Sequence, residues 1–198
     1  MARNDAPPFD RGQYETNEDM SLLAGREYMF EDLNYAQTQG AKAQRSGRLN
    51  RVRLVQNGSG VAILPKQLCQ FSTTPGAINY GCVVSGYVNT TNGRGYPADE
   101  FLPAAGVPAG AYFFIVTKGA ALCRLPNQTA DYGGTNVAVG GVLVGVTSAA
   151  STGVTAGRVA PQSVTASNDA AENYVGRALS AATTGQTDQD VLVDVGKW

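Results

Sequence analysis

The stretch Tyr112-Phe113-Phe114-Ile115-Val116-Thr117 gives the strongest strand signal in this chain. Its residues are aromatic or β-branched and none is charged, which is the composition of a buried strand. Aromatic rings of this kind could stack on a sugar or a base, but a segment this apolar is more often core. The segment therefore predicts a β-rich body with this strand inside it.

Shorter strand signals lie on both sides of this segment. Residues 52–56 alternate between apolar and polar side chains, and the Asn57-Gly58 pair directly after them is a tight-turn signal. Further strands are predicted at 61–64, 120–125, 137–146, 154–159, 174–179 and 191–195. The 24 glycines and nine prolines among 198 residues fit the many turns that such short strands require. We therefore expect a mainly β fold, with a small β-sandwich or a β-tulip or barrel-like body.

The beginning of the chain differs from the rest in its charge. The first 53 residues hold 16 of the 31 charged residues, and the two signs are separated. Residues 1–32 carry eight acids against three arginines, whereas 33–53 carry five bases and no acid. We expect two parts, a long extended N-terminal arm at 1–50 and a β-rich body at 51–198. Within the arm, at most one short helix is predicted, in 18–37, where Gly25 interrupts a loose apolar stripe.

Two interpretations of the arm are open. In the first, the arm binds a partner protein through its large apolar side chains, because such residues in a polar segment are the usual hot-spot candidates. The predicted partner-binding residues are Tyr14, Leu22, Leu23, Tyr28, Met29, Phe30, Arg45 and Arg48. In the second interpretation, residues 18–35 fold back as a helix on their own body.

Residue types that carry catalysis or bind metals are scarce. The chain has no histidine, which removes the commonest general base and the commonest metal ligand. Its three cysteines are scattered and read best as buried free thiols in a reducing compartment, although a bridge between Cys69 and Cys82 is an alternative. We expect no enzymatic activity, no cofactor and no metal site.

The carboxylates offer no better site. Asp99 and Glu100 are adjacent and should point apart in a solvated loop, so they make a poor acid/base pair. Asp188-Gln189-Asp190 resembles a fragment of a calcium loop, but the glycine and the distal glutamate of that loop are missing, so a polar turn is expected.

Charge and hydropathy also exclude two classes of partner. The formal net charge is −1, and the acids that precede the basic run at 42–53 match its charge, so no nucleic acid is expected as a partner. No stretch approaches the roughly 20 apolar residues of a membrane-spanning helix, so no membrane is expected either.

Three segments, taken in order, resemble a known family. Val175-Gly-Arg-Ala-Leu-Ser-Ala-Ala-Thr, a polar turn and Val191-Leu-Val-Asp-Val are similar to the closing motif of small decoration or cement proteins from tailed-bacteriophage capsids. Leu54-Val-Gln-Asn-Gly-Ser-Gly-Val-Ala resembles the early hairpin of that family, and Tyr112-Phe-Phe-Ile-Val-Thr-Lys-Gly resembles its central strand. Together these segments span much of 51–196.

The resemblance implies a structural virion protein on the exterior of an icosahedral capsid, made in the host cytoplasm. Its implied partners are the major capsid protein, whose neighbouring subunits it would bridge, and further copies of itself, as a homotrimer or a dimer. Extended termini in such proteins lie across the capsid protein, which agrees with the first interpretation of the arm.

A second function remains open, that of a receptor- or glycan-binding module such as a head fibre or tail appendage. It requires an exposed pocket of aromatic and carboxylate side chains. The loop at 89–100, with Tyr87, Tyr96 and Asp99, is the candidate for that pocket.

Overall fold

The computed structural model describes residues 6–34, 43–72, 82–86, 94–125, 136–146, 157–161, 174–182 and 189–196, and it confirms a mainly β fold. A 3-10 helix, η1 (Glu18–Leu22), precedes the strands. The strands are β1 (Glu27–Asn34), β2 (Ala43–Asn57), β3 (Leu68–Phe71), β4 (Val83–Gly86), β5 (Tyr96–Pro97), β6 (Tyr112–Arg124), β7 (Val142–Val146), β8 (Arg158–Pro161), β9 (Tyr174–Ala178) and β10 (Asp190–Val195). In these described ranges, no helix is long and apolar enough to cross a membrane.

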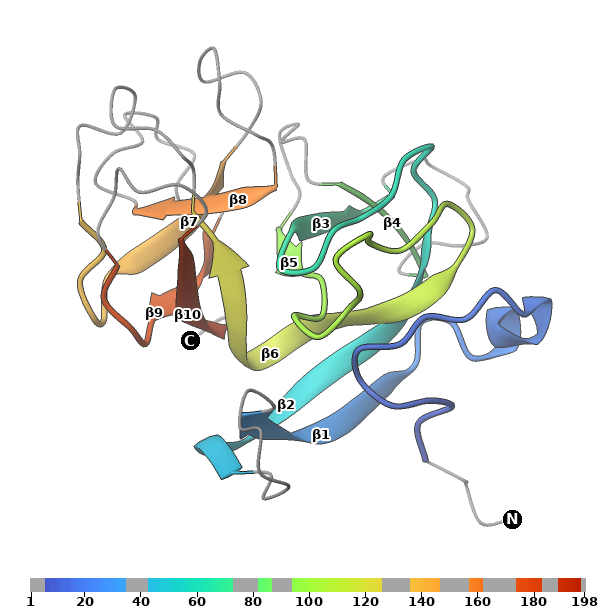
Figure 1. The fold of residues 1–198 in the computed structure, drawn as a ribbon, viewed down its shortest axis with the longest axis horizontal. Coiled ribbons are helices and arrows are strands. Elements are labelled where there is room, and N and C mark those ends of the chain that lie inside the picture. The colour runs from blue at the N-terminus through green and yellow to red at the C-terminus, as the bar shows by residue number, and fades with distance from the viewer. Residues whose placement is uncertain are drawn as a thin grey trace.

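The strands form one mixed sheet in the order β5-β3-β4-β2-β6-β10-β9-β7-β8, with β1 paired to β2 off this path. The pair β2 and β4 is parallel, and the other strand pairs are antiparallel. Figure 1 shows two lobes, one around β2 to β5 and one around β7 to β10, joined by the long strand β6.

The first lobe is a small closed barrel. Strands β5-β3-β4-β2-β6 follow one another, and Ala98, directly after β5, forms an isolated bridge with Ile115 of β6 that closes the ring. Beside this bridge, the N–H of Asp99 donates to the carbonyl of Phe114 at 3.1 Å. The barrel interior holds a buried apolar cluster made of Val55, Ile63, Cys69, Val84, Ala98, Leu102, Val107, Ala111, Phe113 and Ile115.

A bend at Gly119 lets β6 serve both lobes. Before the bend β6 pairs with β2, and after it β6 pairs with β10. Gly119 has φ of 110°, a conformation that side chains disfavour, and a Cβ there would lie 2.3 Å from Oδ1 of Asn50. The Asn50 side chain donates to the carbonyl of Ala120 at 2.9 Å and accepts from its N–H at 2.8 Å. A buried side chain therefore satisfies the backbone groups that the bend removes from the sheet.

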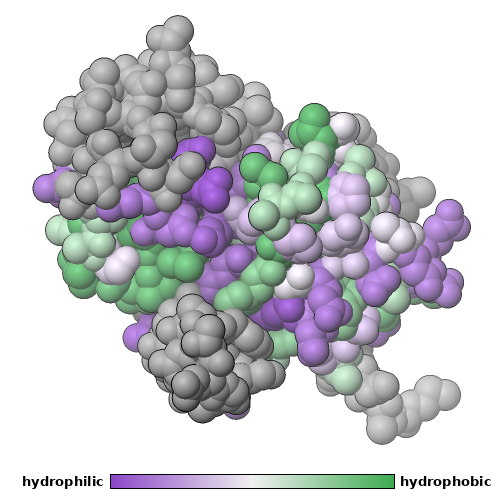
Figure 2. Space-filling view, viewed as in Figure 1, coloured by the Kyte–Doolittle hydropathy of each residue, from purple (hydrophilic) through white to green (hydrophobic). Residues whose placement is uncertain are grey.

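The second lobe consists of β7 to β10 with the far half of β6. Its buried side chains include Leu143, Val159, Val175, Val191 and Val193, and their cluster continues to the outer face of the barrel. Figure 2 shows apolar residues, in green, gathered over the lobe of β7 and β9 at left.

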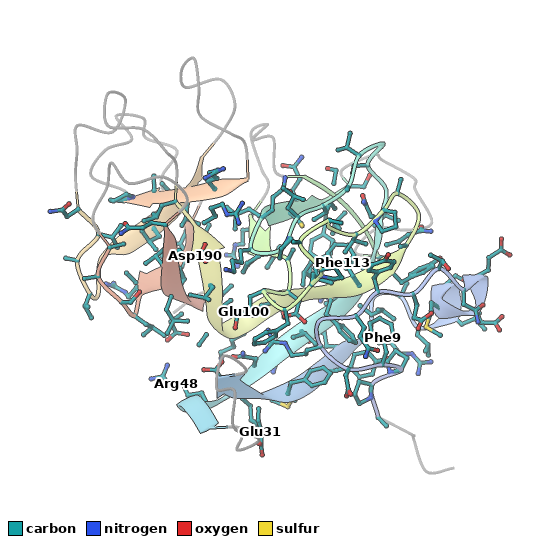
Figure 3. All side chains as sticks on the ribbon, viewed as in Figure 1. Phe9, Glu31, Arg48, Glu100, Phe113 and Asp190 are labelled. Carbon is teal, nitrogen blue, oxygen red and sulfur yellow. The ribbon has the colours of Figure 1, made fainter. Side chains whose placement is uncertain are left out.

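The N-terminal segment covers the outer face of the barrel. Along β6, Phe113 faces the barrel interior and Phe114 faces outward, as alternation in a strand requires. The Phe114 ring contacts the rings of Phe9, Tyr28 and Phe30, with centroid distances of 4.7, 5.8 and 5.5 Å. Figure 3 shows Phe9 and Phe113 on opposite sides of this part of the sheet. The segment therefore completes the core.

This position corrects the expectation of an arm that reaches beyond the body, for the part of the segment that the structure describes. The second interpretation placed 18–35 as a helix on the body; the described part of it, 18–34, does fold back on its own body, but mainly as strand β1 rather than as a helix. Gly25, with φ of 86°, ends the short 3-10 turn. Beyond it Tyr28, Phe30 and Asp32 face the same side, which is the two-residue period of a strand. The expected boundary at residue 50 falls inside β2, which runs without a break from the ribbon into the barrel.

Candidate functional site

A cavity of about 220 Å³ lies at the open end of the barrel, between the two lobes. The following residues line it: Glu27, Arg51, Arg53, Phe71, Arg94, Gly95, Tyr96, Thr117, Lys118, Tyr174, Val175, Val195 and Gly196. We call it the mouth cavity. The mouths of β-barrels and the junctions between lobes are places where binding sites commonly form.

Strand alternation explains why charged residues line this cavity. Val55 of β2 points into the barrel, so Arg53 and Arg51, two and four residues earlier, lie on the same face. On β6, Thr117 follows Ile115 in the same way. The inward faces of β2 and β6 therefore change from apolar to polar where the barrel opens.

Glu27 of β1 holds the two arginines of β2 in place. Arg53 Nη2 lies 2.8 Å from Oε1 of Glu27, and Arg51 Nη1 lies 3.6 Å from Oε2. The Arg53 guanidinium also lies 5.3 Å from the ring centroid of Phe71, which in turn contacts Tyr96 at 5.2 Å. A carboxylate and an aromatic face therefore fix the Arg53 side chain.

Cations outnumber anions around the mouth cavity. Four lining residues are Arg or Lys, and Glu27 is the only lining carboxylate among the described residues. Arg94 and Lys118 form no ion pair within the described part of the chain. The Nε of Arg53 is buried and has no hydrogen-bond partner among the described residues. This arrangement can attract and orient an anion, but it brings together no pair of groups for acid/base chemistry.

Other reactive groups are engaged or buried. Cys69, Cys82 and Cys123 are free thiols, so the alternative of a bridge between Cys69 and Cys82 is wrong. Burial raises the pKa of the Cys69 thiol, and burial together with the nearby carboxylates of Glu100 and Asp190 raises the pKa of the Cys123 thiol. Across the described ranges, no three His, Cys, Asp or Glu residues are grouped so as to hold a metal ion.

The predicted partner-binding residues divide into two groups. Leu23, Tyr28 and Phe30 pack against the chain's own core. These three residues use apolar surface within the fold, and their role as anchors for another protein stays a prediction. Tyr14, Leu22 and Met29 are exposed to 36%, 79% and 60%.

The two predicted basic anchors lie on β2. Arg48 is 58% exposed along its side chain and forms an ion pair of 2.7 Å with Asp194 of β10. This pair ties β2 to the second lobe. The side chain of Arg45 lies outside the described residues.

The described part of the pocket predicted in the loop at 89–100 separates Tyr96 from Asp99. Tyr96 lines the mouth cavity, whereas Asp99 is fully buried and binds Arg11, whose Nη2 lies 2.7 Å from Oδ1. Asp99 is therefore a structural carboxylate, and the expectation that it would meet a ligand or lie in a solvated loop is wrong. Tyr87 and residues 89–93 lie outside the described residues.

Two exposed apolar residues lie on the ribbon formed by β1 and β2. Met29 pairs with Arg51 and Glu31 with Leu49, so these four residues share one face, which we call the ribbon face. Met29 is 60% exposed and Leu49 is 54% exposed. β6 pairs with β2 only from Arg51 onward, so the earlier part of the ribbon extends past the barrel, below β6 in Figure 1.

The sequence pattern missed the cations of the mouth cavity. Arg51 and Arg53 alternate with apolar residues, which predicted a half-buried strand with its polar side in solvent. Arg51 and Arg53 share a strand face with Val55, and this alternation is visible in the sequence. It places the two arginines inside the barrel only if the strand is already known to belong to a closed barrel. No family model matches the sequence, and no curated protein shows significant similarity to it.

Proposed function

We propose that this protein is a structural protein of a tailed-bacteriophage virion, which binds the outside of the capsid and cements neighbouring subunits of the major capsid protein. The observation that carries this proposal is the ribbon of β1 and β2. It extends past the barrel and presents two large apolar side chains, Met29 and Leu49, to solvent. The order of the sequence motifs supports the same role.

The ribbon has the properties of a docking element. In the described residues β1 pairs with β2 along one edge only, so the backbone groups of its other edge are open to a partner strand. A two-stranded ribbon is marginal by itself, and contact with a partner would stabilise its extension. Charges of opposite sign surround the two apolar residues and would fix the register of docking.

Variants of the ribbon face test the proposal in a sedimentation assay with assembled heads of the source phage. Met29→Lys with Leu49→Lys removes two exposed apolar contacts, each worth about 1 kcal/mol or more when buried, so affinity should fall on the order of 30-fold. Val61→Lys is the matched control, because Val61 is 70% exposed but lies outside the ribbon. Equal binding by both variants would refute the role of the ribbon.

Self-association is the second part of the proposal. Light scattering should give the mass of a trimer, or of a dimer, since linked copies bind a symmetric shell with greater avidity. Copies that associate only on the shell would give a monomer in solution but more than one copy at each binding site on the heads.

A receptor- or glycan-binding appendage is the second candidate. The mouth cavity favours it, because Tyr96 and Tyr174 line that cavity and could stack on a sugar ring. Binding on a glycan array without binding to heads would favour this function over cementing.

A further inference from the structure

We propose that the mouth cavity is a binding site for an oxyanion, namely a carboxylate, sulfate or phosphate, carried on a ring of sugar size. This inference is independent of the capsid role, since it uses other side chains and an isolated protein suffices to test it. It rests on the charge, the unsatisfied Nε donor of Arg53 and the aromatic walls of one cavity.

The first step is electrostatic. Arg51, Arg53, Arg94 and Lys118 surround a cavity with one carboxylate, and Glu27 is already engaged by two of the arginines. Arg94 and Lys118 are exposed and carry no counter-charge among the described residues. Cations gathered in a concave surface concentrate anions more strongly than the same charges spread over a flat surface.

The second step is the unused donor. The Nε of Arg53 is buried without a partner in the described chain, although Nη2 of the same guanidinium donates to Glu27 at 2.8 Å. A buried donor without an acceptor is costly, and a ligand oxygen would remove that cost. Because Glu27 and the Phe71 ring hold the guanidinium, it is already oriented for a ligand.

The third step is the shape of the walls. Tyr96 and Tyr174 line the cavity, and Phe71 packs behind Tyr96 at 5.2 Å. Aromatic faces next to cations suit a ligand with a flat apolar face and a charged group. A volume of about 220 Å³ can hold one ring with its substituent.

The test monitors the side-chain Nε–H resonance of Arg53 by NMR during titration of the isolated protein. The probes are glucuronate, glucose 6-phosphate, inorganic phosphate, inorganic sulfate and neutral glucose. We expect saturable shifts with the two charged sugars, weaker binding of the inorganic anions, and no shift with glucose. Raising the salt concentration from 0.05 to about 0.5 M should weaken binding severalfold, because part of the site is exposed.

Variants locate the site. Arg94→Gln with Lys118→Gln should reduce affinity for the charged sugars about tenfold, as expected for two partly exposed charge contacts. Arg26→Gln is the control, because Arg26 is exposed and outside the cavity lining. The proposal is overturned if no charged sugar produces a saturable shift at millimolar concentration, or if the double variant binds as tightly as the control. If inorganic phosphate bound as tightly as glucose 6-phosphate, the inference that the ligand carries a ring of sugar size would be overturned.

Discussion

Replacing Asp99 with Asn should destabilise the protein by about 3–5 kcal/mol, because it leaves a buried guanidinium without its counter-charge. The Asp99 carboxylate accepts from Arg11 Nε at 3.2 Å, from Arg11 Nη2 at 2.7 Å and from the N–H of Gly12 at 2.9 Å. The two side chains are 1% and 0% exposed, so water cannot replace the lost partner. The loss is a large share of the roughly 5–15 kcal/mol that stabilises a typical domain.

Urea unfolding followed by circular dichroism measures this free energy. The double variant Arg11→Met with Asp99→Asn should recover much of the loss, because it removes both buried charges, and the coupling energy should be at least about 2 kcal/mol. Arg48→Met is the control. Its ion pair with Asp194 is 58% exposed on the arginine side, so it should cost about 1 kcal/mol or less.

A loss below about 1 kcal/mol for Asp99→Asn, with single-variant effects that simply add, would show that the buried pair contributes little to stability. It would mean that the pair does not clamp the N-terminal segment to the loop after β5. The interpretation of that segment as a free arm would then regain its support.

Four further predictions concern the bend and the thiols. Asn50→Ala should cost about 1–3 kcal/mol in urea unfolding, because it removes the two buried hydrogen bonds that the Asn50 side chain forms with the backbone of Ala120; an effect within error would contradict the bend's dependence on this side chain. Gly119→Ala should lower the midpoint of thermal unfolding by on the order of 10 °C, because a Cβ at φ of 110° meets Asn50 within 2.3 Å, and an unchanged midpoint would be inconsistent with the observed bend. In a thiol-reagent assay at about pH 8, half-buried Cys82 should react first, and the other two thiols, whose pKa values burial raises, should react only after unfolding. Three thiols reacting at one rate in the folded protein would contradict the burial of Cys69 and Cys123. Since these buried thiols stay protonated in the folded state while unfolded thiols ionise, the free energy of unfolding should fall as the pH rises above about 9.

The sequence predicted the fold class because its strand signals are local. The run at 112–117 is inside β6, and the closing strand at 191–195 is inside β10. The sequence predicted separate strands at 112–117 and 120–125, but β6 continues through Gly119. The reason is not local, since the side chain of Asn50, from 70 positions earlier, supplies the hydrogen bonds at the bend.

The separated charges of the N-terminal segment were noticed, but their pairing within the chain was not predicted. They looked like the signature of an arm that docks elsewhere. In the structure the acidic strand β1 lies antiparallel to the basic half of β2, so Glu27 meets Arg51 and Arg53. Pairing between residues that lie far apart along the chain cannot be read from composition. For the same reason the mouth cavity, which gathers residues from β1, β2, β3, β5, β6, β9 and β10, could not be predicted.

In the function that we propose, the protein docks on an assembled shell through the ribbon of β1 and β2. Hydrogen exchange of the ribbon amides, measured alone, with soluble capsid subunits and with assembled heads, tests it most directly. We expect amides on the open edge of β1 to become protected only when assembled heads are present. Binding to heads without protection of β1, or no binding to heads at all, would contradict it.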